Sequence, residues 1–227
     1  MTARLAWLSL TVALYVTTRR AQERARGSPL VNPVLLSATL VIAVLALTHR
    51  DVSEYRAAGQ PLLWLLGPAT VALAVPLYRA MHEIRSALVP VLSALLVGST
   101  ATVVTAVALG RGLGATIDTT RALAAKSVTT PIAMAITEQL GGVPPLAAVF
   151  VMITGSLGAV FGGGVFHASG VRDERARGFA MGIVAHGMGT ARAFQLSTVA
   201  GTFSGIAMTL NGVLTAIVLP VVWLLFS

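Results

Sequence analysis

The chain has 227 residues, of which 56% are hydrophobic and only 11% are charged. A soluble globular domain carries about 25% charged residues, so this composition excludes an ordinary water-soluble domain. Cysteine is absent, which excludes a disulfide framework, a thiolate nucleophile and a cysteine-based metal site. Because apolar runs near the length of a bilayer span recur along the chain, we expect an all-α integral membrane protein.

The net charge is +8, and the arginines lie mostly in short connections between apolar runs. This distribution is typical of cytoplasmic loops that obey the positive-inside rule, so we expect a lipid bilayer and no nucleic acid as a partner. The first run, 3–18, has a single arginine, Arg4, at its beginning and is followed by Arg19 and Arg20. Because a signal peptide carries its charge before the apolar core, we expect a first membrane helix here.

In chain order, the apolar runs predict about seven transmembrane helices and one ambiguous segment at 120–140. The runs cover residues 3–18, 30–48, 62–78, 87–109, 146–166, 178–198 and 203–226. No polar connection between them is long enough to form a second domain. We therefore expect a single multi-pass domain over 1–227 in the cell membrane.

The arginine-rich loops predict the topology. The stretch "RRAQERAR" is the richest, and placing it in the cytoplasm puts the N-terminus outside. If 120–140 crossed the membrane, the later loop "HASGVRDERAR" would lie outside, against the same rule. We therefore expect 120–140 to be re-entrant or broken, which is permitted where the backbone lines a wet cavity or is buried in protein. The C-terminus is then predicted to be cytoplasmic.

Two inverted three-helix repeats follow from this topology, one at about 30–110 and the other at about 144–226. The middle member of each carries a predicted helix break. In "LLGPATVALAVPLY" the break falls at Gly67, Pro68 and Thr70, and in the second repeat it falls in "AHGMGTARAF". Proline removes a backbone donor and glycine weakens a helix, and paired discontinuous helices are typical of a secondary transporter's binding site.

The stretch "AAKSVTTPIAM" holds Lys126, the only lysine among the 16 Lys and Arg residues. It is followed by Ser127, Thr129, Thr130 and Pro131. A cation and three hydroxyls ahead of a helix N-terminus predict a pocket that attracts an anion. The alternative is that Lys126 is an interface residue that extends its ammonium to the lipid headgroups.

His186 and Arg192 lie within the apolar run 178–198. An ionisable group inside a span costs about 2.5–3.5 kcal/mol on insertion scales and usually marks a site or a pathway. We therefore expect both residues to be functional. The GxxxG spacings Gly158–Gly162 and Gly201–Gly205, in contrast, are fully explained by close helix packing.

The motifs "KSVTTPIAM", "EQLGGVPPLAAVFVMITG", "AHGMGTARAF" and "FSGIAMTLNGVLTA" together resemble the LrgB/CidB family, in the same order and over essentially the whole chain. This family includes antiholin-like proteins and the plastid glycolate/glycerate translocator. The resemblance implies a membrane protein that handles small monocarboxylates such as pyruvate, glycolate, glycerate or 3-hydroxypropionate. It also implies a small LrgA/CidA-type membrane protein as a partner.

The predicted site combines these elements. Arg192 can bind a carboxylate in a bidentate manner, and Gly187 and Gly189 leave backbone N–H groups accessible. Threonine hydroxyls can bind a keto or hydroxyl oxygen, and His186 can couple transport to a proton. The predicted substrate-binding residues are Lys126, Ser127, Thr129, Thr130, Pro131, His186, Gly187, Gly189, Thr190 and Arg192.

Beyond H⁺ or Na⁺ as a coupling ion, the sequence predicts no cofactor and no metal site. It contains no G-x-S-x-G or H-E-x-x-H motif, so we expect no catalytic residue and no enzyme. The alternative function is an antiholin-like interaction protein that forms oligomers and regulates murein hydrolase export and cell lysis. The GxxxG faces fit that alternative, but it leaves His186 and Arg192 without a role.

Overall fold

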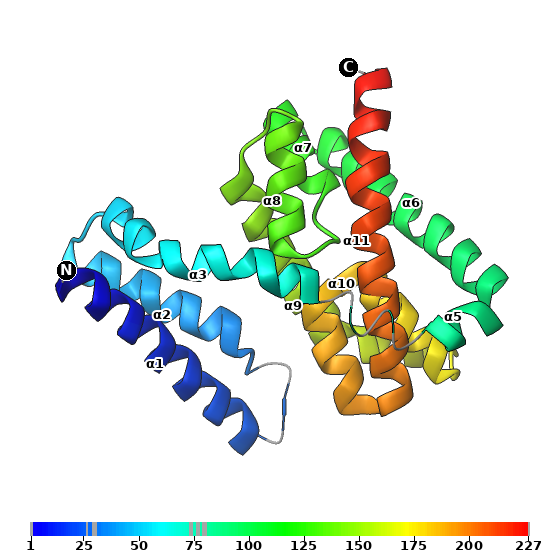
Figure 1. Cartoon of the computed structure of the whole chain (residues 1–227), viewed down its shortest axis with the longest axis horizontal. Helices are drawn as coiled ribbons and strands as arrows, with labels where there is room; N and C mark the ends of the chain where they lie inside the picture. The colour runs from blue at the N-terminus through cyan, green and yellow to red at the C-terminus, as the bar shows by residue number, and fades with distance from the viewer. Residues whose placement is uncertain are drawn as a thin grey trace. The chain divides into compact units, whose positions relative to one another are not determined.

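Helices account for nearly all of the regular structure in the computed structural model of the chain (Figure 1). The structure describes residues 2–25, 27–28, 31–72, 75, 78 and 81–226. Contacts divide the chain into two compact units, Met1–Val71 and Ala72–Ser227. The boundary falls inside the region predicted to form the first repeat.

The first unit contains α1 (Thr2–Arg24), α2 (Pro33–Thr48) and α3 (Val52–Ala72). Asn32 begins α2 because its side-chain oxygen accepts hydrogen bonds from two backbone N–H groups of the first turn. The helix ends at His49, which adopts a left-handed conformation with φ 50°. Trp7 packs edge-to-face on Tyr55, with 5.6 Å between the ring centroids, and so ties α1 to α3.

Within the described residues, the helix break predicted at Gly67, Pro68 and Thr70 does not occur. Helix α3 continues through Gly67, Pro68 and Thr70 and also contains Pro61. An internal proline removes one hydrogen bond and bends a helix, but the turns on either side can keep the helix continuous. The further proline of this motif, Pro76, lies outside the described residues.

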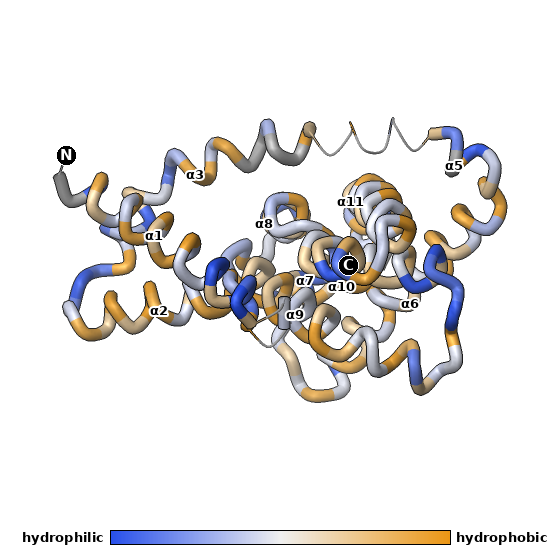
Figure 2. Tube along the Cα trace, turned by 90° about the horizontal axis from the view of Figure 1, so that it is seen from below, coloured by the Kyte–Doolittle hydropathy of each residue, from blue (hydrophilic) through white to orange (hydrophobic). Residues whose placement is uncertain are grey.

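The second unit begins with the short helix α5 (Met81–Ser86) and contains three long apolar helices, α6 (Leu88–Gly112), α9 (Pro144–Ala168) and α11 (Thr198–Phe226). These three are, in the described part of the chain, the helices long and apolar enough to cross a membrane. They confirm the predicted runs 87–109, 146–166 and 203–226. Figure 2 shows hydrophobic residues along most of the helices and hydrophilic residues mainly in the connections.

Two short helices, α7 (Ile117–Ala124) and α8 (Thr130–Gln139), replace a continuous span at 120–140. The guanidinium of Arg121 donates a hydrogen bond of 3.1 Å to the Gly141 carbonyl, which joins the beginning of this segment to its end. We call residues 117–139 the first hairpin. The segment is broken, as predicted from the sequence.

Helix α10 (Glu174–Leu196) is interrupted at His186, where two helical arms meet at a kink. A straight helix of its 23 residues is about 35 Å long. Instead, the Ser197 hydroxyl donates a 2.8 Å hydrogen bond to the Glu174 carboxylate, so the two ends lie together. We call residues 174–196 the second hairpin, with a first arm at 174–185 and a second arm at 187–196.

The prediction that 178–198 crosses the membrane is therefore wrong. Its glycines and histidine permit the chain to reverse direction, which a helical hydrophobic pattern alone does not reveal. The second half of the chain consequently does not consist of three spans, and the predicted superposition of two three-helix repeats is not confirmed.

Helix α11 packs against both hairpins, but at different positions along its length. Near its start, the carbonyls of Ala200 and Ser204 contact Gly178 and Gly182 of the second hairpin so closely that neither glycine has room for a Cβ atom. Near its other end, Leu219 belongs to the hydrophobic cluster around the first hairpin. Each hairpin therefore occupies one half of α11.

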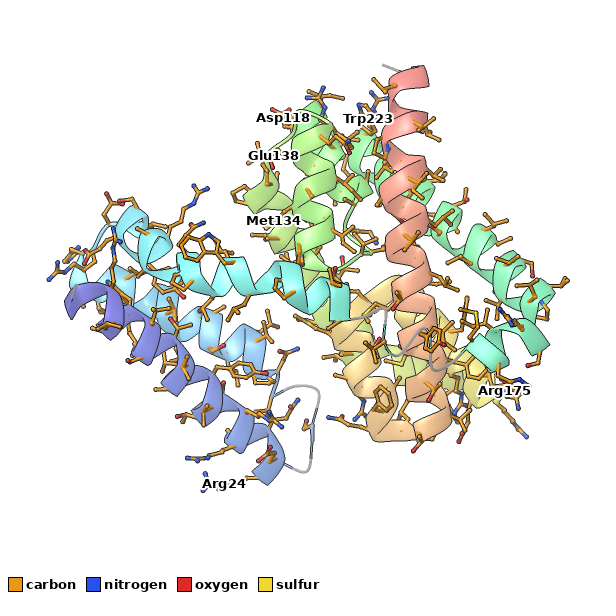
Figure 3. The ribbon with its side chains drawn as sticks, viewed as in Figure 1. Arg24, Asp118, Met134, Glu138, Arg175 and Trp223 are labelled. Carbon is orange, nitrogen blue, oxygen red and sulfur yellow. The ribbon has the colours of Figure 1, made fainter. Side chains whose placement is uncertain are left out.

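The two hairpins enter the unit from opposite ends (Figure 3). Asp118 and Glu138, at the open end of the first hairpin, lie at the same end as Trp223, whereas Arg175, at the open end of the second, lies at the other. The 167–177 connection and the C-terminus are thus separated by the length of α11. The predictions that both are cytoplasmic cannot hold together, because the second hairpin turns back instead of crossing.

Candidate functional site

His186 forms the turn of the second hairpin. Its φ of 41° and ψ of −131° are non-helical, and such a conformation costs a residue with a Cβ atom about 1–3 kcal/mol. The side chain is buried, and its Nε2 lies 3.0 Å from the Val151 carbonyl oxygen of α9. Gly155 makes room for the ring, because a Cβ atom there would lie 2.7 Å from the His186 Cε1. Helix α9 thus holds the break in place.

The two predicted glycines next to this turn have different roles. Gly187 is exposed, and the nearest atom to an added Cβ would be the Met208 sulfur at 3.9 Å, which is ordinary contact. At Gly189 an added Cβ would lie 2.6 Å from the Met181 carbonyl oxygen of the first arm. Gly187 therefore leaves the backbone accessible, whereas Gly189 permits the two arms to pack closely.

Thr190 and Arg192 lie farther along the second arm. The Thr190 hydroxyl donates to the His186 carbonyl and lies 2.9 Å from the Ser204 hydroxyl of α11, so its hydrogen bonds join the hairpin to that helix. Arg192 is half-buried and donates a 2.9 Å hydrogen bond to the Gln195 side chain. Six residues at 1.5 Å each place its backbone about 9 Å from the break.

The first hairpin breaks at residues 125–129, and this break contains Lys126. Lys126 is half-buried, and its ammonium donates a 3.3 Å hydrogen bond to the Ser127 hydroxyl. None of the three ion pairs found among the described residues includes Lys126. The carbonyl of the next residue, Ser127, and the Ile183 carbonyl of the second hairpin both accept hydrogen bonds from the Asn211 side chain. The structure therefore brings the lone lysine and the second break together.

Helix α8 begins at this first break. Thr129 is the residue before the helix, yet its side chain makes no capping hydrogen bond, and its hydroxyl is buried without a partner among the described residues. Thr130 and Pro131 follow as the first two helical residues. The N-terminus of a helix carries a partial positive charge and free N–H groups, so this end of α8 favours an anion.

Asn211, in the middle of α11, shows that the two breaks are adjacent. Its side-chain nitrogen donates to the Ser127 carbonyl at 3.2 Å and to the Ile183 carbonyl at 3.3 Å, and the residue is almost fully buried. Sequence reasoning did not single out this residue. The feature of the sequence that could have identified Asn211 is the amide side chain within the apolar stretch "FSGIAMTLNGVLTA", because a polar group in such a stretch needs a hydrogen-bond partner within the protein.

The electrostatics of the paired breaks favour a small anion. Helix α8 starts at the first break, and the second arm of the second hairpin starts at the other, so two helix N-termini and one ammonium are close to the same region. In the part of the chain that the structure describes, no three His, Cys, Asp or Glu side chains are grouped closely enough to hold a metal ion. The arrangement offers hydrogen-bond donors and positive charge from two hairpins.

Comparison with known proteins assigns a family. The model of the LrgB-like family matches residues 11–225. The chain is 35% identical to the uncharacterized protein YwbG of Bacillus subtilis over 213 residues, 94% of each chain. It is 30% identical to the holin-like protein CidB of Staphylococcus epidermidis over 217 residues, which cover 96% of this chain and 94% of CidB. Neither name denotes an enzyme. No solved structure matches the chain.

Proposed function

Because the chain belongs to the LrgB-like family, we propose that it is a secondary transporter, or a subunit of one, for small monocarboxylates. The observation that carries this proposal is the meeting of two oppositely directed broken hairpins beside Lys126, a cation without an acidic partner among the described residues. Helix N-termini that face each other from broken segments are a common way of binding anions at membrane depth.

The number of charges supports a monoanion. Lys126 is one cation, and a single carboxylate balances it without adding net charge to the interior. The unpartnered Thr129 hydroxyl is available for a second oxygen of the substrate, which fits a 2-oxo or 2-hydroxy acid such as pyruvate, glycolate or glycerate. Gly187 adds accessible backbone at the opposite break.

We assign Arg192 to the approach to the site. Its guanidinium bonds to Gln195, about two turns from the break, and it can exchange that neutral partner for a carboxylate on its way to Lys126. His186, whose ring already bonds to α9, is assigned to holding the turn; a role in proton coupling remains a prediction.

The proposed orientation places the 167–177 connection, with Arg172, Arg175 and Arg177, in the cytoplasm. The C-terminus is then outside, because α11 separates the two. A small LrgA/CidA-type partner and a homo-oligomer belong to the same proposal.

The second candidate is an antiholin-like role, favoured by the name of CidB, which is called holin-like. The two candidates differ in solute flux. Purified protein in liposomes, with and without an LrgA-type partner, should accumulate labelled pyruvate or glycolate down an imposed gradient if the first is correct. Binding to the partner without uptake of any monocarboxylate would favour the second.

A further inference from the structure

We propose that Asn211 is a positioning residue that locks the two broken hairpins to each other by donating one N–H to a carbonyl at each break. The structural part of this inference stands on the hydrogen bonds of Asn211. Its effect on substrate binding rests on the proposed function.

Both carbonyls lack a regular helical environment. Ser127 lies in the irregular segment between α7 and α8. Ile183 would accept from the N–H of Gly187 in a continuous helix, but the non-helical dihedral angles of His186 interrupt that pattern. A carbonyl left unpaired at membrane depth is costly, so each break needs a donor from elsewhere in the protein.

The primary amide of Asn211 suits this position because its nitrogen carries two N–H groups. One group serves each hairpin, at 3.2 Å and 3.3 Å. The amide oxygen accepts a hydrogen bond of 3.4 Å from the hydroxyl of Thr215, one turn farther along α11, and this bond fixes its orientation. Asn211 is one of the largest fully buried side chains among the described residues, so its orientation is strongly constrained.

The hydrogen bonds of Asn211 affect whether the site attracts anions or cations. Carbonyl oxygens at a helix break attract cations, and N–H groups attract anions. Asn211 donates to one carbonyl at each break, so these two carbonyl oxygens are already hydrogen-bonded. The electrostatic potential of the site is then dominated by the helix N-termini that start at the breaks. Replacing Asn211 with Asp removes both donors and sets a carboxylate against two carbonyl oxygens, close to the site of the anion.

The experiment uses the full chain, whose lack of cysteine permits selective labelling. Spin labels are placed at Gln139 on the first hairpin and Ala191 on the second, both exposed positions. The distance distribution between the labels is then measured in liposomes for wild type, Asn211→Leu, Asn211→Asp and Asn211→Gln. Thr209→Val is the matched control, because the Thr209 hydroxyl donates to the Gly205 carbonyl within α11 and joins no hairpin among the described residues.

We expect a narrow distribution in wild type and Thr209→Val and a broadened or shifted one in Asn211→Leu and Asn211→Asp. The half-saturation concentration for pyruvate uptake should rise about tenfold or more in both variants, and Asn211→Gln should recover part of each effect. If Asn211→Leu does not fold, Asn211→Ser, which is too short to reach both carbonyls, replaces it with the same expected result.

An unchanged distance distribution in the Leu or Ser variant would overturn the inference. A broadened distribution with an unchanged half-saturation concentration would overturn the effect of Asn211 on substrate binding, although Asn211 would still join the two hairpins. If wild type transports no monocarboxylate, the proposed function fails, and the distance measurement alone still decides whether Asn211 joins the hairpins.

Discussion

At the scale of single residues, Lys126 and His186 are the polar groups whose surroundings are hardest to explain by packing. Lys126 is half-buried with one weak hydrogen bond to Ser127, and no ion pair among the described residues includes it. His186 has a positive φ, a backbone conformation that residues with a Cβ atom rarely adopt. Unpaired charge and local strain both concentrate at functional sites, because surrounding structure must stabilise them.

Lys126→Met removes the charge but keeps a side chain of similar length. If Lys126 binds the carboxylate, the loss of a charge-assisted hydrogen bond should cost about 1.5–3 kcal/mol, which raises the half-saturation concentration about 10- to 150-fold. Uptake of labelled pyruvate or glycolate in proteoliposomes measures this. Arg172→Gln, which removes one charge from an exposed loop, is the control. Equal effects of the two changes would show that only the total charge matters.

Arg192→Lys tests the approach residue in the same assay. Lysine keeps the charge but loses the planar fork of arginine. Because Arg192 lies about two turns from the break, we expect a smaller rise in half-saturation than Lys126→Met produces. A larger effect at Arg192 would identify it as the main carboxylate ligand.

His186→Gly and His186→Ala separate backbone strain from the loss of the ring. Both variants lose the hydrogen bond to Val151, but only glycine adopts a φ of 41° without strain. We expect His186→Gly to unfold at a higher temperature than His186→Ala, by about 1 kcal/mol or more in stability. The measurement is thermal unfolding in detergent. In a regular helix, alanine stabilises the protein by about 1 kcal/mol relative to glycine. A higher unfolding temperature for His186→Ala than for His186→Gly would therefore show that the turn is absent.

At the scale of elements, the hairpins depend on glycines that let neighbouring helices approach. Gly155 of α9 lies against the His186 ring, and Gly178 and Gly182 of the second hairpin lie against carbonyls of α11. Two other glycines of α9, Gly163 and Gly164, face open space. Helix α9 therefore contains one glycine, Gly155, that is needed for packing, and others at which the same substitution meets no neighbour and can serve as a control.

Gly155→Ala should lower the unfolding temperature and impair uptake. The new methyl group would lie 2.7 Å from His186 Cε1 and 2.9 Å from the Met188 sulfur, and overpacking of this kind costs about 1–3 kcal/mol. Gly163→Ala, in the same helix with nothing within 4 Å, should be neutral or slightly stabilising. Equal unfolding temperatures for the two variants would contradict the close contact between α9 and the second break.

At the scale of the whole molecule, the order of α6, first hairpin, α9, second hairpin and α11 determines the sidedness of the second unit. The two ends of each hairpin lie together, and the three long helices are the elements of the described second unit that are long and apolar enough to cross a membrane. The second unit thus holds two hairpins that enter from opposite ends and meet at Asn211.

Single cysteines at Gln139 and Arg172 test this order with a maleimide that does not cross the membrane. Arg172→Cys should react only from the cytoplasmic side, and Gln139→Cys and a C-terminal tag only from outside. Intact cells and inverted vesicles supply the two sides. A C-terminal tag accessible from the same side as Arg172 would mean that 174–196 crosses the membrane after all.

The amino-acid sequence by itself determined the membrane environment, the three long spans, the break near Lys126 and the break near His186. These features depend on local sequence. The length of an apolar run decides whether it can insert into a membrane, and glycines, hydroxyls and charges within such a run interrupt the helix at their own positions. Tertiary structure alone decided that 174–196 turns back, that α3 continues through Pro68, and that Asn211 joins the two breaks. A broken apolar segment has the same hydrophobic pattern whether it crosses or returns, and contacts with α9 and α11, distant in sequence, select between the two.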